Sequence, residues 1–549
     1  MGPSSDAAAG TRPPQKATRR MFFFAIWISF AAWLANFDGG FGGIVLIMPS
    51  YKSAFGHCQQ LLDPETGTKT EECVLSTLQQ SLVGVGVLFM AVGSAATGFV
   101  GSKFGRKGTI QIGCVISIIG AAGMLGTSGN FVAFVACKSI AGVGLGMLCA
   151  TAIVYGCECV VPSQRGLLLG LYNIGLALGN LSAAAVCAGS STLEADNDWQ
   201  WKTPIICQIP LGILLGAGIL MFPESPRWLL LRGEEDRARK SFATFQGLDE
   251  NSPEVTAQVQ EVQQYLEFER AAMKDTSWME IYRGTNLRRT LVSGMILIGL
   301  AITGIQFVAT YAALFLSGVG ISNTYLINAI VYLCILAGAC IGPALIEYGG
   351  RRFAMLTGYA LMASCMLILS SVSTGVGPEN KAAKNVVVAF LCLWAFAFGG
   401  FIGPSVWLAS AEMHSLRLRT YGQANTTFLY EIFAFGAQFW TPYMLNVNYG
   451  NMGSNVGYFY FGITVVVLIF TFFFVPETAR LNLEQIDDFF LSGDNAWRTS
   501  TKGNIAIARS GLSESSKMVD AEDRGSENQK KDGSPSSEHN EFEDFVVGA

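Results

Sequence analysis

Charged side chains are scarce in this sequence. Asp, Glu, Lys and Arg make up 14% of its 549 residues, whereas hydrophobic residues make up 51%. Soluble domains carry about 25% charged residues, so this balance excludes an ordinary water-soluble protein. The chain has 36 Lys and Arg against 41 Asp and Glu, so it has no excess of positive charge and we expect no nucleic-acid partner. The composition indicates an integral membrane protein.

Histidine is rarer still. The chain has three, His57, His414 and His539, and they lie far apart in the sequence. No helix or loop offers a nucleophile beside a base, and no group of residues has the spacing of a metal site. We therefore expect neither an enzyme nor a metal centre, and no cofactor.

Long apolar runs are abundant instead. A bilayer core about 30 Å thick needs roughly 20 apolar residues for each spanning helix. We expect twelve such helices, in two sets of six, which makes an all-α membrane protein. Their expected ranges are 21–47, 76–100, 108–127, 131–153, 167–189 and 203–222, then 291–317, 324–346, 353–373, 385–410, 426–446 and 456–475.

These runs divide the chain into five parts. A tail, 1–20, precedes a six-helix bundle over 21–222; a polar linker of amphipathic helices, 223–290, precedes a second bundle over 291–475. The tail 476–549 should be mostly disordered after 491, because its composition cannot bury a core. Most Lys and Arg in the loops lie on the side of the linker, which predicts that the linker and both termini face the cytoplasm. We expect the protein to lie in the cell membrane.

Most of the 13 cysteines fall in apolar runs, where Cys is a small buried hydrophobe. Cys58 and Cys73 differ, because both lie in the polar loop between the first two spans. Outside the cell that loop would meet an oxidising environment. A disulfide and two free thiols both remain open.

Short motifs stand at the expected ends of the spanning helices. They are GRK at 105–107, ECVVPSQRG at 158–166, PESPRWLL at 223–230, EYGGRR at 347–352, PSVWLASAE at 404–412 and PET at 476–478. Together they resemble the motifs of the major facilitator superfamily, and within it those of the sugar porters. The resemblance covers roughly 21–490, with features of fungal alpha-glucoside permeases near its end. It implies the major facilitator fold and a monomer in the bilayer.

Charges at the expected cytoplasmic helix ends form a candidate gate. Arg and carboxylate groups make strong bidentate pairs, and pairs that join the two halves would stabilise the outward-open state. The alternative is that these charges are solvated loop residues. The residues are Glu158, Arg165, Glu347, Arg351, Arg352, Glu412 and Arg419.

Asp38 lies within the first apolar run, where a carboxylate costs roughly 2.5–3.5 kcal/mol on insertion scales. Proton-coupled sugar porters carry an acid here and an arginine in the fourth helix, where this chain has Lys138. The resemblance predicts an Asp38–Lys138 pair that separates when Asp38 takes up a proton. A fixed ion pair that only packs two helices is the alternative.

The expected substrate site departs from the hexose porters. Their two helix-seven glutamines are replaced by Leu300 and Ala301, which predicts weak glucose recognition. Glu431 is either a ligand for a hydroxyl-rich or cationic substrate, the partner of an unseen cation, or a protonated or water-facing carboxylate. The candidate substrate-binding residues are Asn173, Gln306, Trp407, Tyr430 and Glu431.

Three functions are compatible with these residues. The first is a secondary active transporter that moves a sugar or sugar-like small polar solute by alternating access, coupled to protons in symport. The second is an exporter of a small secondary metabolite on the same fold. The third is a sugar sensor that no longer transports.

Overall fold

The structure is a computed structural model that describes residues 18–505. Residues 63–68, 161–163, 274–276, 322, 377–379, 416, 482 and 494 within that range are not described. Both outer parts of the expected tails, 1–17 and 506–549, therefore lie outside the described residues.

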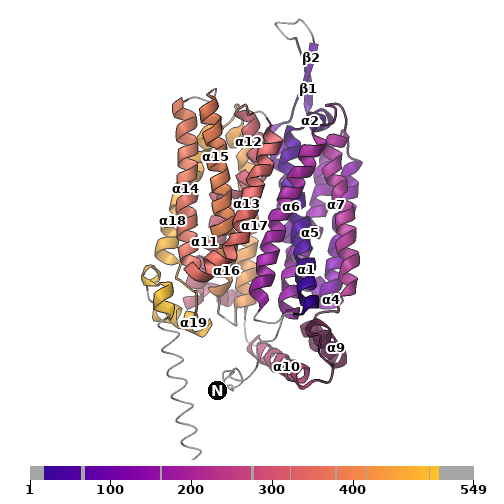
Figure 1. The fold of residues 1–549 in the computed structure, drawn as a ribbon, viewed down its shortest axis with the longest axis vertical. Coiled ribbons are helices and arrows are strands. Elements are labelled where there is room, and N and C mark those ends of the chain that lie inside the picture. Colours follow the sequence, from indigo (N-terminus) through magenta and orange to yellow (C-terminus); the bar gives the residue numbers. More distant parts are fainter. Residues whose placement is uncertain are drawn as a thin grey trace, which may run out of the picture.

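Long helices dominate the described chain and lie side by side (Figure 1). The first half of the chain contains one antiparallel hairpin, β1–β2, beside its helices. Its elements are α1 (Arg19–Ile44), α2 (Pro49–Phe55), β1 (His57–Leu62), β2 (Lys69–Val74), α3 (Thr77–Leu82), α4 (Val85–Leu125), α5 (Phe131–Cys159), α6 (Arg165–Ser190) and α7 (Trp199–Gly218).

The linker forms three helices, and a second set of long helices follows. The linker helices are α8 (Pro226–Leu231), α9 (Glu235–Gln246) and α10 (Pro253–Met273). The second half contains α11 (Gly284–Leu300), α12 (Ala312–Gly318), α13 (Thr324–Gly349), α14 (Arg351–Val376), α15 (Lys381–Ala397), α16 (Gly403–Glu412), α17 (Arg419–Leu445), α18 (Val456–Phe474) and α19 (Leu483–Ser492).

Ten stretches of the described residues are long and apolar enough to cross a membrane. One of them, Thr77–Leu125, is 49 residues long and contains Gly105 at φ 77°, so it holds two spans. The more polar helix α17 supplies the remaining span. The arrangement is that of twelve spanning helices, as the apolar runs predict.

Glycines let the two arms of α4 lie directly against α5. A Cβ on Gly142 would lie 2.5 Å from the Gly86 carbonyl oxygen, and one on Gly144 would lie 2.5 Å from the Ser117 nitrogen. Residues 86 and 117 belong to different arms of α4, so both arms contact the same stretch of α5 and run in opposite directions. Small residues at such interfaces are needed because lipid provides no hydrophobic drive between helices.

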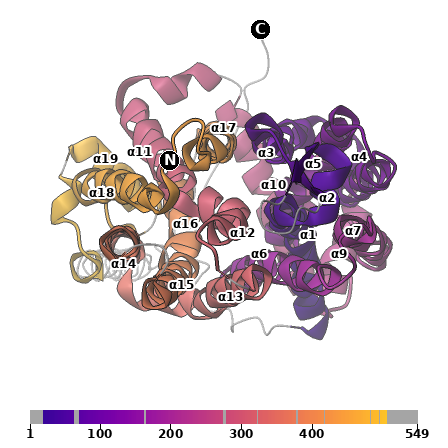
Figure 2. The same cartoon turned by 90° about the horizontal axis from the view of Figure 1, so that it is seen from above.

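The chain forms two bundles that stand next to each other. Seen from above, the helices of the first half gather on one side and those of the second half on the other (Figure 2). The β1–β2 hairpin projects from one end of the molecule, and α9 and α10 lie at the opposite end (Figure 1). We call these the hairpin end and the linker end.

The seventh spanning helix is interrupted at its centre. Between α11 and α12 the backbone makes π-helical turns over Ala301–Ile305 and Phe307–Tyr311. Gly304 adopts φ 109°, a conformation that residues with a Cβ rarely adopt. The interruption places the side chain of Gln306 between the two turns.

The described chain continues past 491 to residue 505, whereas the rest of the tail that we expect to be mostly disordered, 506–549, lies outside the described residues. Ala496 is buried, and Asn504 Nδ2 donates hydrogen bonds to the carbonyl oxygens of Glu477 and Ala479 at 2.8 and 3.0 Å. Thr501 Oγ1 donates to Gly349 O at 3.0 Å. Polar side chains of this segment thus satisfy backbone groups at the linker end of the second bundle.

Candidate functional site

Asp38 and Lys138 form a buried ion pair between α1 and α5. Lys138 Nζ lies 2.8 Å from Asp38 Oδ2 and also donates to the Asp38 carbonyl oxygen at 3.2 Å. The two side chains are 6% and 4% exposed. Removing either partner would leave a buried charge without compensation, which is why such pairs are costly to break.

Two further residues complete this site. Gln208 of α7 donates from Nε2 to the second carboxylate oxygen, Asp38 Oδ1, at 3.1 Å. The ring of Phe41 lies 4.4 Å from Lys138 Nζ, a distance at which a cation is attracted to the aromatic face. Our sequence reasoning missed Gln208, although a glutamine within an apolar run is a visible signal.

An aromatic cluster covers the hairpin side of this ion pair. Tyr51 and Phe55 of α2 pack against Phe134 and Trp201, with ring centroids 5.2–6.2 Å apart across the cluster. Phe134 lies one helical turn before Lys138 on α5. The cluster therefore separates the ion pair from the hairpin end of the molecule.

The two halves also touch at the hairpin end. Ser81 Oγ donates to Phe439 O at 2.9 Å, and Asn446 Nδ2 donates to Thr77 Oγ1 at 2.9 Å. Tyr311 OH donates to Gln80 O at 3.1 Å. These bonds tie α3 to α17 and to the seventh spanning helix, so the passage between the halves is closed there.

Polar and aromatic residues meet along α17 in the second half, beside the interrupted seventh spanning helix. Gln438 Nε2 of α17 donates to Gln306 Oε1 at 2.7 Å, and Tyr430 lies beside Gln306. The rings of Tyr430 and Trp407 meet edge to face at a centroid distance of 5.0 Å. The structure thus brings together three expected site residues, Gln306, Tyr430 and Trp407, and adds Gln438.

Asn173 and Glu431 approach the same region. Asn173 of α6 is close to Gly403 of α16 in the other half, and its Nδ2 has no hydrogen-bond partner in the described structure. Glu431 follows Tyr430 on α17 and lies within electrostatic range of Cys149 on α5. Both residues therefore face the boundary between the two halves.

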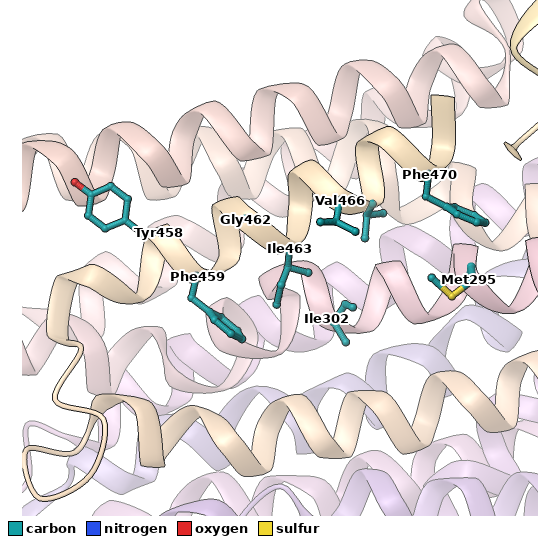
Figure 3. A pocket seen from close by; sticks show the side chains of 9 residues that line it. Met295, Ile302, Tyr458, Phe459, Gly462, Ile463, Val466 and Phe470 are labelled. Carbon is teal, nitrogen blue, oxygen red and sulfur yellow. The ribbon is translucent and has the colours of Figure 1, made fainter. Parts of the chain in front are cut away.

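An apolar groove lies elsewhere, between α11 and α18. It has a volume of about 460 Å³ and is lined almost entirely by apolar side chains, among them Met295, Ile302, Ile463 and Phe470 (Figure 3). Such a lining offers a hydroxylated solute almost no hydrogen bonds. Ile302 therefore belongs to this apolar groove and not to the polar site.

At the linker end, the first half contains a compact charge network. Arg106 makes a bidentate pair with Glu158, with nitrogen to oxygen distances of 2.7 and 2.9 Å. Glu224 accepts backbone N–H bonds from Arg106 at 2.9 Å and Lys107 at 3.2 Å. Ser225 Oγ donates to Glu158 and links the two carboxylates.

The second half repeats this network. Arg351 pairs with Glu412 at 3.1 Å, and Thr478 Oγ1 donates to the same carboxylate. Glu477 accepts backbone N–H bonds from Arg351 at 2.9 Å and Arg352 at 3.1 Å. The duplicated sequence motifs therefore fold into duplicated networks.

We expect pairs that join the halves in the outward-open state, and this conformation, closed at the hairpin end, leaves that prediction untested. In the described part of the chain, the ion pairs of Arg106 and Arg351 stay within one half each and do not join the halves. Arg165 and Glu347 are exposed, and Arg419 lies near Glu412 of its own half. With the hairpin end closed, Arg106 and Arg351 each pair with a carboxylate of their own half.

His414 lies buried in the turn between α16 and α17. Its side chain packs against Gly422, where a Cβ would lie 2.2 Å from His414 Nδ1. Burial, with the nearby guanidinium groups of Arg419 and Arg289, lowers the pKa of His414 to about 4. The imidazole is therefore neutral at physiological pH.

The hairpin contains the disulfide that the sequence left open. Cys58 and Cys73 occupy facing positions on β1 and β2, and their sulfur atoms are bonded. The bond closes the hairpin at its base, where it meets α2.

Two six-helix bundles with a polar site between them define a secondary carrier of the major facilitator type. A family model described as "Sugar (and other) transporter" matches residues 24–490. The chain belongs to this family, and so it is a membrane transporter and not an enzyme. The expected fold class is confirmed.

Individual relatives are distant. The chain is 27% identical to the "Probable glucose transporter rco-3" of Neurospora crassa, over 90% of this chain and 82% of that protein. It is 26% identical to the "High glucose sensor RGT2" of Saccharomyces cerevisiae, over 90% of this chain and 64% of that protein. The solved proton:xylose symporter XylE, bound to 6-bromo-6-deoxy-D-glucose, shares the fold with TM-score 0.69 at 20% identity, covering 86% and 99% of the two chains.

Proposed function

We propose that this protein takes up a sugar or sugar-like polar solute by proton symport across the cell membrane. The linker end and both termini face the cytoplasm, so the described conformation is closed to the outside. The observation that carries the proposal is the buried Asp38–Lys138 pair, in a chain of the sugar transporter family. An ionisable residue kept inside a membrane protein is most often functional.

The geometry supports a simple coupling cycle. From the outside, a proton binds the Asp38 carboxylate and removes its negative charge, so the contact with Lys138 weakens. Gln208 can keep a hydrogen bond to the neutral acid, because an amide both donates and accepts. After the carrier turns inward, Asp38 releases the proton to the cytoplasm and the ion pair forms again.

The solute would bind between the halves, beside Asn173, Gln306 and Tyr430. Amides and aromatic faces suit hydroxyl-rich molecules, since each amide can both donate and accept. Alternating access is supported by the closed hairpin end and by the charge networks that lie within each half. Each half contains its own Arg–Glu network. This repetition supports a mechanism in which the two halves move as rigid bodies about a central site.

Uptake measurements test this function. Cells without their own sugar carriers would express the chain and receive a panel of labelled sugars, with and without a protonophore. We expect concentrative uptake that the protonophore abolishes. Asp38→Asn should lose accumulation but keep exchange of the same solute, because an amide of similar size cannot take up a proton. Normal concentrative uptake by Asp38→Asn protein in the membrane would contradict the proposal.

The same panel separates the alternatives. Efflux of a preloaded solute without uptake would favour an exporter. Binding or signalling without either flux would favour a sensor.

A further inference from the structure

Glu431 is a carboxylate in the middle of the spanning helix α17. Among the described residues it has no ion pair, and its side chain makes no hydrogen bond, although it is only partly exposed. Asp38, by contrast, has both Lys138 and Gln208. A carboxylate at this depth is expensive unless a positive charge or a proton compensates it.

The position of Glu431 directs it toward the solute. Tyr430, its neighbour in sequence, packs against Trp407 in the polar site. Glu431 itself lies near Cys149, which belongs to α5 of the other half. The carboxylate is thus at the boundary between the halves, where a transported solute must pass.

A second unsatisfied acceptor lies on the same face of α17. Gln438 follows Glu431 by seven residues, which is two helical turns. It is 6% exposed, and its Oε1 has no hydrogen-bond partner in the part of the chain that the structure describes. The Nε2 of Gln438 is already used by Gln306. This face of α17 therefore offers the Glu431 carboxylate and, about 10 Å farther along the helix axis, the Gln438 Oε1, which lies against Gly84 of the first half.

We propose that the solute carries a basic nitrogen, as in an amino sugar or amino polyol, and that its ammonium group binds Glu431. An ammonium has three donors and no acceptor, which matches the two carboxylate oxygens of Glu431. It also cancels the negative charge of Glu431 during transport. The aromatic rings of Tyr430 and Trp407 would attract the same cation. The inference rests on the proposed sugar transport and deepens it.

The test compares solutes of similar size that differ in charge. Cells that express the full chain would receive labelled D-glucosamine, D-glucose or N-acetyl-D-glucosamine at a pH where glucosamine is protonated. A charge-assisted hydrogen bond is worth about 1.5–3 kcal/mol, so glucosamine should have a KM about tenfold to a hundredfold below that of both neutral sugars.

Two variants test the residue. Glu431→Gln keeps size and hydrogen bonding but removes the charge, and it should abolish the preference for glucosamine over both neutral sugars. Glu431→Asp keeps the charge and should retain part of the preference. If Glu431→Gln fails to reach the membrane, the comparison of solutes in the unmodified protein still decides.

The outcomes distinguish the two proposals. Equal KM values for glucosamine and glucose in the unmodified protein would overturn the role of Glu431 and leave sugar transport standing. A glucosamine preference that persists in Glu431→Gln would overturn it too. If no sugar of either kind is transported or competes, the proposed function itself is overturned.

Discussion

Glu224 and Glu477 hold equivalent positions in the two halves of the protein. Each carboxylate accepts two consecutive backbone N–H groups directly after a glycine at positive φ, Gly105 at 77° and Gly350 at 94°. A Cβ on either glycine would lie 2.4 Å from the glutamate Oε2. The sequence motifs therefore encode one structural unit twice, a glycine turn closed by a distant carboxylate.

This symmetry predicts similar losses from two matched changes. Glu224→Gln and Glu477→Gln each remove a charged acceptor of two N–H bonds, and hydrogen bonds to charged groups contribute about 1.5–3 kcal/mol. Both variants should lower the thermal unfolding midpoint of the purified protein by similar amounts. Glu250→Gln, an exposed change in the linker, is the control. An unchanged midpoint in either variant would show that its turn does not depend on the carboxylate.

His414 predicts an acid-sensitive contribution to stability. Its pKa of about 4 in the folded protein lies below the ordinary value of 6.5, so the unfolded chain binds the proton more tightly. The stability from the neutral imidazole is complete above pH 6.5 and is lost as the pH falls toward 4, by about 3 kcal/mol. His414→Asn should flatten this part of the profile of midpoint against pH. Parallel profiles for both proteins would exclude the effect.

The fold follows from the sequence because each spanning helix needs its own apolar run. Helix α17 was expected on the same ground. It is less apolar than the other spanning helices because it contains Glu431 and Gln438, which belong to the polar site. Asp38 and Lys138 could be paired by their resemblance to other carriers. The contact between Gln208 and Asp38 could not be predicted, because the two residues are 170 positions apart in the sequence. An apolar run does not indicate which face of the helix a single glutamine occupies.

For the charges of the candidate gate, the sequence predicts the positions but not the partners. Sequence identifies Glu158, Arg351 and Glu412 as charges at helix ends, but pairing depends on which end of the carrier is closed. In the described conformation each half satisfies its own charges, and the ordered segment Ala496–Arg498 and Asn504 add contacts that a polar composition concealed.

Gln306 and Gln438 should act as a unit in solute binding. Gln306→Leu or Gln438→Leu each removes one hydrogen-bonding amide and leaves the other without its partner. Either change should raise the KM for the transported solute by about twofold to tenfold, because each lost hydrogen bond contributes about 0.5–1.5 kcal/mol. The double variant should cost less than the sum of both, because the Gln438–Gln306 bond is counted twice. Strictly additive losses would show that the two amides act independently.

The Asp38–Lys138 pair makes the sharpest prediction about folding and coupling together. Lys138→Ala leaves the Asp38 carboxylate buried without a cation, which costs about 3–5 kcal/mol, so the amount of folded protein in the membrane should fall. Lys138→Arg keeps the charge and should be mild. The double variant Asp38→Asn with Lys138→Ala removes both charges, and it should restore folded protein in the membrane without restoring accumulation against a gradient. Quantified membrane protein and protonophore-sensitive uptake, measured on the same cells, separate the two effects. If the double variant folds as poorly as Lys138→Ala alone, the lysine acts through its packing against Phe41 and Gly86. The ion pair would then have no role in the proposed coupling cycle.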